Sequence, residues 1–178
     1  MKNDRFSENI LKGRMAETLV EEMLRTSGNT VYRFGYESIV QNLTQLEQSF
    51  DTYATVGERI RAIPDFIVID GKGEPTFVEV KFRFDAAKPL HDETIEVLER
   101  VEKYWNSLII FVNCTEEPYF RICKPPYFKT FSQPKRGLVF EPLSSVEAWN
   151  ISPEVYAEYE ALVKKYLTPT LRSEGELG

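Results

Sequence analysis

Two apolar segments separated by a short polar turn stand out in the middle of the chain. Residues 63–69 read IPDFIVI and residues 76–82 read TFVEVKF, and both are rich in the β-branched and aromatic residues that favour strands. Between them, residues 71–74 (GKGE) have the composition of a tight turn. We therefore expect a hairpin that brings Asp65, near the start of its first strand, close to Glu79 in the second.

The second of these strands has two different faces, because alternate residues of a strand point to opposite sides. One face is apolar and the other carries charge: the first consists of Val78, Val80, Phe82 and Phe84, and the second includes Glu79, Lys81 and Arg83. On an ordinary antiparallel strand, such charges form an ion pair that faces water. That interpretation leaves the nearby Asp65 unexplained, so we favour a functional site.

An amphipathic helix is expected before the hairpin, over residues 7–26. Its apolar residues recur every three or four positions, which is the spacing of one helix face: Leu11, Met15, Ala16, Leu19, Val20 and Met23. Ser7 is a suitable N-cap for this helix, and Gly28 is a suitable stop.

Two residues at the edge of this helix face have a candidate role. Gly13 and Glu17 lie one turn apart, and a glycine within a helix costs about 1 kcal/mol relative to alanine. We therefore expect Gly13 to permit close backbone approach to the sheet or to a ligand. Glu21 and Glu22 are expected to be solvated surface residues, as most glutamates are.

The remaining pattern predicts a mixed α/β fold. Strands are expected at residues 30–36, 108–113, 120–123 and 137–140, and helices at residues 37–58, 91–105 and 152–166. We expect one domain across residues 1–168, with a central mixed β-sheet flanked by helices, and a loose tail at residues 169–178.

Composition narrows the class of protein. With 178 residues, 42% of them hydrophobic, the chain can bury one sizeable core. The polar N-terminus is unlike a signal peptide and no apolar run approaches the length of a membrane span, so we expect a cytoplasmic protein with no membrane partner. Cys114 and Cys123 lack zinc-site spacing and are expected to be reduced thiols. The single histidine, His91, argues against a histidine-based triad.

The charged residues of the hairpin suit a divalent cation. Mg²⁺ prefers hard oxygen ligands and keeps several waters, so two carboxylates and one carbonyl make a half-filled site. Asp65, Glu79 and the backbone carbonyl of Val80 are the candidate ligands for Mg²⁺ or Mn²⁺. Lys81 stands beside them and can orient a water and stabilise developing negative charge.

Pro64-Asp65 followed by Glu79-Val80-Lys81 resembles the motif of the PD-(D/E)XK nuclease superfamily, which has the restriction-endonuclease-like fold. The resemblance covers roughly residues 8–113 and extends to the preceding helix. In the resolvase-like and RecB-like branches a glycine and then a glutamate on the first helix face the metal site, which implies that role for Gly13 and Glu17. A glutamine or tyrosine often follows on a later helix, and Tyr104 is the residue here that matches.

A basic and aromatic segment at residues 119–140 is a candidate nucleic-acid surface. It has five cations and no acid, although the whole chain has a net charge of −6. We consider Lys124, Lys129, Lys135 and Arg136, together with Arg83, as phosphate contacts, and the interleaved aromatics as a base-stacking surface. The alternative is that these aromatics pack on the core, and we weigh the two equally.

These observations predict a metal-dependent nuclease that hydrolyses phosphodiester bonds in nucleic acid, most simply DNA. Catalysis is expected from Asp65, Glu79 and Lys81 with support from Glu17, and a homodimer would suit cleavage of both strands of a duplex. The alternative is a catalytically silent protein of the same fold that acts as a nucleic-acid-binding or regulatory module. A protein-interaction role without metal is a third alternative.

Overall fold

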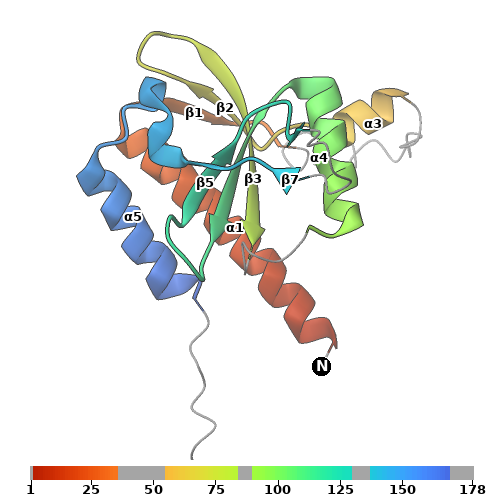
Figure 1. Ribbon diagram of the computed structural model, residues 1–178, viewed down its shortest axis with the longest axis horizontal. Coiled ribbons are helices and arrows are strands. Elements are labelled where there is room, and N and C mark those ends of the chain that lie inside the picture. Colours follow the sequence, from red (N-terminus) through yellow and green to blue (C-terminus); the bar gives the residue numbers. More distant parts are fainter. Residues whose placement is uncertain (1, 36–54, 84–89, 130–136, 169–178) are drawn as a thin grey trace, which may run out of the picture.

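The computed structural model describes residues 2–35, 55–83, 90–129 and 137–168 (Figure 1). Its helices are α1 (Lys2–Thr26), α3 (Thr55–Arg61), α4 (Asp92–Trp105) and α5 (Pro153–Tyr166), with two short 3₁₀ turns at Leu143–Ser145 and Glu147–Trp149. The strands are β1 (Thr30–Arg33), β2 (Phe66–Ile69), β3 (Pro75–Arg83), β4 (Leu108–Asn113), β5 (Phe120–Cys123), β6 (Phe128–Lys129), β7 (Gly137–Leu138) and β8 (Glu141–Pro142).

Six of these strands form one mixed sheet in the order β1-β2-β3-β4-β5-β8. The central pair β3–β4 is parallel, and the other neighbours are antiparallel. The crossover between the parallel strands contains α4. The sequence-based prediction of an α/β fold with a mixed sheet flanked by helices is therefore confirmed.

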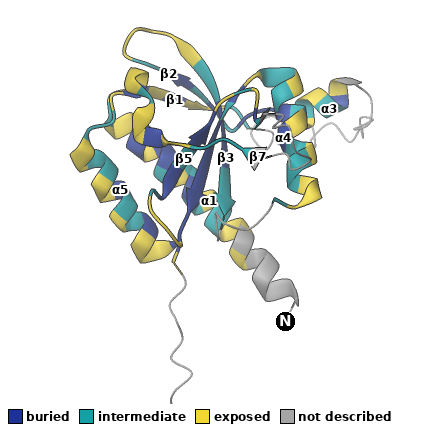
Figure 2. Cartoon of the chain, in the orientation of Figure 1, coloured by how far each residue is buried: buried dark blue, intermediate teal, exposed yellow. Residues whose placement is uncertain are grey.

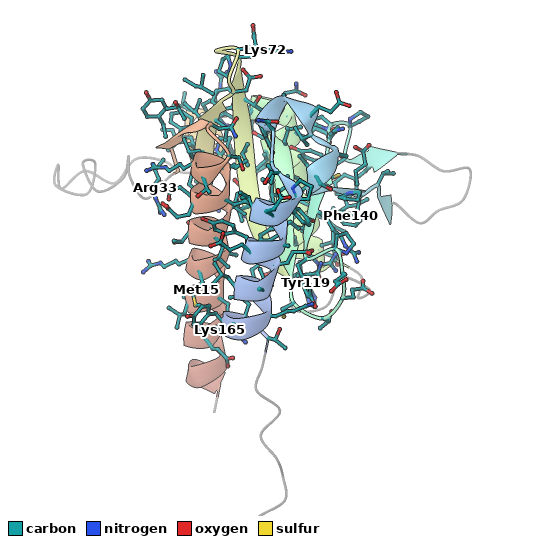
Figure 3. All side chains as sticks on the ribbon, turned by 90° about the vertical axis from the view of Figure 1, so that its left-hand side faces the viewer. Met15, Arg33, Lys72, Tyr119, Phe140 and Lys165 are labelled. Atoms are coloured by element: carbon teal, nitrogen blue, oxygen red, sulfur yellow. The ribbon has the colours of Figure 1, made fainter. Side chains whose placement is uncertain are left out.

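Two apolar layers hold the helices against the sheet. On one face, α1 and α5 pack side by side over a core that includes Val78, Val80 and Ile110 (Figures 1 and 3). On the opposite face, Leu98 of α4 packs with Ile109 and other residues of a smaller cluster. Figure 2 shows that buried residues concentrate in the central strands and on the helix sides that face them. The sheet is therefore covered on both faces, as its apolar central strands require.

The expected hairpin is present as β2 and β3. In its turn, the side chain of Asp70 accepts hydrogen bonds from the backbone N–H groups of Lys72 (2.8 Å) and Glu74 (3.0 Å). Gly73 has a φ of 84°, a conformation that favours glycine. The first residue of β2, Phe66, lies opposite Val78. Since β3 continues to Arg83, its last five residues run beyond the end of β2, which leaves one edge of β3 open there.

Several predicted boundaries and faces differ from the structure. The first helix begins at Lys2 rather than at Ser7, and β1 ends at Arg33 rather than at residue 36. Leu11 was expected on the buried face but is 59% exposed, because the helix extends past the edge of the sheet at its N-terminal end. The helix expected over residues 37–58 falls mainly outside the described residues, and only α3 at its end can be compared.

Gly13 and Glu21 also differ from expectation. A Cβ added at Gly13 would meet no atom of the described residues within 4 Å, so the expected close approach to the backbone is not observed there. Glu21 is only 5% exposed, because α1 packs against β1 and the side chain is enclosed by two arginines. Glu22 is exposed as expected.

The cysteines agree with the sequence-based prediction, since Cys114 and Cys123 are both buried and neither forms a disulfide. Within the described ranges, no helix combines the length and apolar character needed to cross a membrane.

Candidate active site

A cavity of about 270 Å³ opens where β3 extends beyond β2. All four predicted catalytic residues line it, namely Glu17, Asp65, Glu79 and Lys81. They come from three elements: α1, the residue before β2, and β3. Val97 and Val101 of α4 close the opposite side. The tertiary structure therefore brings together residues that are separated by up to 64 positions in the sequence.

Asp65 is fixed by backbone contacts on both sides. Its Oδ2 accepts a hydrogen bond from the N–H of Val80 (2.8 Å), at a point of β3 that β2 no longer reaches. Its carbonyl accepts hydrogen bonds from the N–H groups of Phe34 (2.8 Å) and Gly35 (3.2 Å). The Asp65 carboxylate thus accepts the hydrogen bond that a neighbouring strand would accept from β3 at this point.

The Val80 carbonyl is oriented by the same edge. The N–H and C=O of one strand residue point to the same neighbouring strand. Because the Val80 N–H points to Asp65, its carbonyl points toward the same open edge. The carboxylates of Asp65 and Glu79 line the cavity, and the direction of the Val80 carbonyl follows from the hydrogen bond of its N–H to Asp65.

Glu79 and Lys81 form an ion pair inside the cavity, between Lys81 Nζ and Glu79 Oε1. The Glu79 side chain is 7% exposed and that of Lys81 is 31% exposed. This excludes the ordinary alternative for the strand, because an ion pair on a wet sheet face would be largely exposed. A buried carboxylate of this kind needs a partner, and here the partner is the neighbouring ammonium group.

The crowding of charge shifts two pKa values. Burial, followed by the nearby carboxylates of Glu79 and Glu17, raises the pKa of Asp65 to about 8, while Lys81 and the Val80 hydrogen bond oppose the shift. Burial alone would lower the pKa of Lys81, but the charges of Glu79 and Asp65 outweigh it and raise the pKa. Lys81 is therefore protonated throughout the physiological range.

The donor set fits a divalent cation of the Mg²⁺ type. In the described part of the chain, no three carboxylate, imidazole or thiolate side chains stand together as a complete metal cage. Mg²⁺ does not need such a cage, because it is commonly held by one or two carboxylates together with waters and substrate phosphates. The raised pKa of Asp65 comes first from burial and then from the negative charge of Glu79 and Glu17, and a bound cation would favour the ionised carboxylate against both effects.

Three arginines complete the cavity wall: Arg14, Arg33 and Arg61. They were not among the predicted site residues. Arg14 lies three residues before Glu17, so the helix spacing could have indicated it. Arg33 could not be found in this way, because its position depends on the pairing of β1 with β2.

An aromatic cluster helps to position the wall that carries Arg61. The rings of Phe34, Phe77 and Trp105 contact one another with centroid distances of 5.3–5.8 Å. Trp105 Nε1 donates a hydrogen bond to the carbonyl of Arg59 (3.1 Å), which ties α3 to α4. The last residue of α3, Arg61, is thereby held at the cavity.

Two predicted auxiliary residues lie away from the cavity. The Tyr104 hydroxyl donates a hydrogen bond to Glu58 Oε2 (2.7 Å), so this side chain joins α4 to α3 instead of facing the acidic residues. Gly13 does not line the cavity either. The role that the resemblance implied for these two residues is not supported by their positions.

The basic segment is mainly structural where it is described. Tyr119, Phe120 and Tyr127 are buried in the core, and the Tyr127 hydroxyl donates to the carbonyl of Ser107 (2.6 Å). These aromatics therefore pack on the core and do not form a stacking surface. Lys124 is exposed but pairs with Glu141 (2.7 Å). The side chain of Lys129 and all of Lys135 and Arg136 lie outside the described residues.

Arg83, at the end of β3, is partly exposed, and its guanidinium lies 6.0 Å from the centre of the Phe111 ring. It does not line the cavity.

Comparison with known proteins adds no relative to this picture: no protein-family model matches the chain, and no curated protein matches it. The functional argument therefore depends on the cavity itself.

Proposed function

We propose that this protein is a metal-dependent nuclease of the PD-(D/E)XK type, with a restriction-endonuclease-like core, that hydrolyses phosphodiester bonds in nucleic acid, most simply DNA. The observation that carries the proposal is the convergence of Glu17, Asp65, Glu79 and Lys81 in one cavity. A conventional surface ion pair would require neither the burial of Glu79 nor the presence of Asp65 beside it.

Asp65, Glu79 and the Val80 carbonyl would hold the Mg²⁺ or Mn²⁺. When bound, such a metal lowers the pKa of a coordinated water and offsets phosphate charge. Lys81 is protonated and stands beside Glu79, so it can orient the attacking water and stabilise negative charge that develops on the phosphate. Glu17 faces the same cavity from α1 and can hold waters next to the metal ligands.

Cleavage of a panel of labelled DNA and RNA substrates tests this proposal. The panel contains single strands, duplexes, flaps and junctions, each incubated with Mg²⁺, Mn²⁺ or EDTA. We expect metal-dependent cleavage by the unaltered protein, and a loss of at least about a hundredfold in Asp65→Asn, Glu79→Gln and Lys81→Met. Circular dichroism melting of each variant establishes that it folds.

Two matched controls come from the turn of the hairpin. Glu74 and Lys72 are exposed there, so Glu74→Gln and Lys72→Met remove the same charges from the same hairpin outside the cavity. We expect both to cleave normally. Full activity in any of the three cavity variants would contradict the role assigned to that residue.

A binding or regulatory module remains the second candidate, and the Lys81–Glu79 ion pair favours it, because that ammonium occupies a carboxylate oxygen that a metal would need. Tight binding of nucleic acid without cleavage in any metal would select this candidate over the nuclease.

A further inference from the structure

Arg33 lines the acidic cavity from the end of β1. Its Cα partner across the sheet is Phe66, the residue directly after Asp65. The residue after Arg33, Phe34, donates its N–H to the carbonyl of Asp65 (2.8 Å). Strand pairing therefore fixes the backbone of Arg33 next to that of Asp65. The Arg33 side chain lines the same cavity as the carboxylates of Glu17, Asp65 and Glu79.

The buried carboxylate of Glu21 holds the Arg33 side chain. Glu21 Oε2 accepts from Arg33 Nε (2.8 Å) and pairs with Arg33 Nη2 (2.5 Å). The Glu21 side chain is 7% exposed, and its other oxygen pairs with Arg25 Nη2 (2.8 Å). The Arg33 guanidinium also lies 5.8 Å from the centre of the Phe66 ring. These contacts orient the guanidinium before any ligand arrives.

The arrangement retains positive charge at the cavity. Two guanidinium groups, from Arg25 and Arg33, share one carboxylate, so one positive charge is left over. An arginine has five N–H donors, and the contacts with Glu21 engage only Nε and Nη2. The Arg33 side chain remains 52% exposed, and in Figure 3 it lies beside α1 at the surface. Its free donors can therefore reach a ligand.

We propose that Arg33 binds a phosphate group of the substrate next to the acidic residues, and that Glu21 is the positioning residue that holds Arg33 for this contact. The planar guanidinium fork matches phosphate oxygens, and preorganisation reduces the entropy lost on binding. This inference rests on the proposed function in one respect, namely that the ligand is nucleic acid. The phosphate can be an internal phosphodiester or a terminal phosphate.

Binding measured without metal tests the inference separately from cleavage. We would follow fluorescence anisotropy in EDTA with a 3′-labelled single-stranded DNA 12-mer, prepared with and without a 5′-phosphate. Arg33→Gln should weaken binding about tenfold and reduce the slope of log K against log[salt] by about 0.7. If only the phosphorylated strand is affected, the contact is to the terminal phosphate, and if both are affected equally, it is to an internal one.

Arg25→Gln is the matched control. It removes the other guanidinium from Glu21, and Arg25 does not line the cavity. We expect this variant to bind DNA with nearly unchanged affinity and salt slope. Wild-type affinity in Arg33→Gln, or an equal loss in Arg25→Gln, would overturn the inference. Arg33→Lys keeps the positive charge but lacks the planar guanidinium group, so it should recover only part of the binding. It also provides a second variant if Arg33→Gln folds poorly.

Glu21→Gln tests the positioning role. Removing a negative charge beside the cavity would by itself strengthen binding of a phosphate. Weaker binding in this variant can therefore come only from the lost orientation of Arg33, and we expect a loss of about threefold or more. Unchanged or tighter binding would overturn the role of Glu21. A protein that binds in this way but never cleaves would refute the nuclease proposal while leaving the Arg33 contact in place.

Discussion

At the scale of single residues, the site is defined by opposite charges that share a small, poorly solvated space. Glu79 is nearly inaccessible and pairs with Lys81, while the Asp65 carboxylate accepts a hydrogen bond from the Val80 N–H. Burial, followed by the negative charges of Glu79 and Glu17, raises the pKa of Asp65 to about 8. Asp65 is therefore the residue whose protonation reports on the site.

The raised pKa of Asp65 predicts a pH-dependent stability in the absence of metal. The folded-state pKa of about 8 exceeds the ordinary value of 3.8, so the folded protein holds a proton that the unfolded chain releases. The free energy of unfolding should therefore fall as pH rises from about 4 to about 8. Urea unfolding in EDTA measures this. The difference in the free energy of unfolding between the wild type and Asp65→Asn should change with pH across this range.

Asp70→Asn is the control for this measurement. The pKa of Asp70 is lowered by hydrogen bonds from the backbone N–H groups of Glu74 and Lys72. The ionised Asp70 carboxylate therefore stabilises the folded protein at pH values above its ordinary pKa, and this stabilisation is lost only as the pH falls below that pKa. The difference in the free energy of unfolding between the wild type and Asp70→Asn should therefore be constant between pH 5 and 8. A constant difference for Asp65→Asn as well would contradict the raised pKa.

At the scale of elements, unequal strand lengths create the site. β2 has four residues and β3 has nine, so the edge of β3 is open from Glu79 onward. Asp65, Glu17 and Arg33 reach this opening from three different directions. A longer β2 would pair with this edge and remove the opening.

Helix α1 contributes to the site through Glu17, but its glycine has no packing role. Because a Cβ at Gly13 would meet nothing within 4 Å, Gly13→Ala should stabilise the protein by about 1 kcal/mol. Chemical unfolding would measure this, and DNA binding should not change. Gly28→Ala provides the contrast, since Gly28 has a φ of 88° after the end of α1 and the variant should be destabilised. A destabilised Gly13→Ala would indicate a close contact at this position.

At the scale of the whole molecule, the helices on the two faces of the sheet limit the access of water to the residues that line the cavity. α1 and α5 cover one face and α4 covers the other (Figure 1), and residues of both α1 and α4 line the cavity together with Phe66, the first residue of β2. Repulsion between the carboxylates inside this cavity therefore lowers the free energy of unfolding of the whole protein.

Divalent metal should therefore stabilise the folded protein. A ligand that binds only the folded state adds RT ln(1 + [L]/Kd), about 2.7 kcal/mol at a hundredfold excess over Kd. We expect millimolar Mn²⁺ to raise the melting temperature of the wild type and of Glu74→Gln, but not that of Glu79→Gln. An equal response of all three proteins, or none in the wild type, would argue against metal binding by Glu79.

The local sequence pattern determined the elements and their inner faces. Alternation in residues 76–82 predicted the strand with Val78 and Val80 inside, and the GKGE turn predicted its pairing with the preceding strand. The strands expected at residues 108–113 and 120–123 have the observed boundaries of β4 and β5, and the helix expected over residues 152–166 agrees within one residue with α5. These features could be read because they depend on periodicity and turn chemistry within a few residues.

The sequence by itself also identified four of the charged residues that meet in the cavity: Asp65, Glu79 and Lys81 through their spacing on the hairpin, and Glu17 through the resemblance to a known motif. The tertiary structure decided what surrounds them. The burial of Glu21, its hold on Arg33 and the open space at Gly13 depend on how α1 lies against β1 and past the sheet edge. The burial of Tyr119 and Tyr127 depends on the core that forms around them. Such contacts join residues that are distant in the chain, and no local pattern records them, because burial and charge pairing are fixed only when the layers pack.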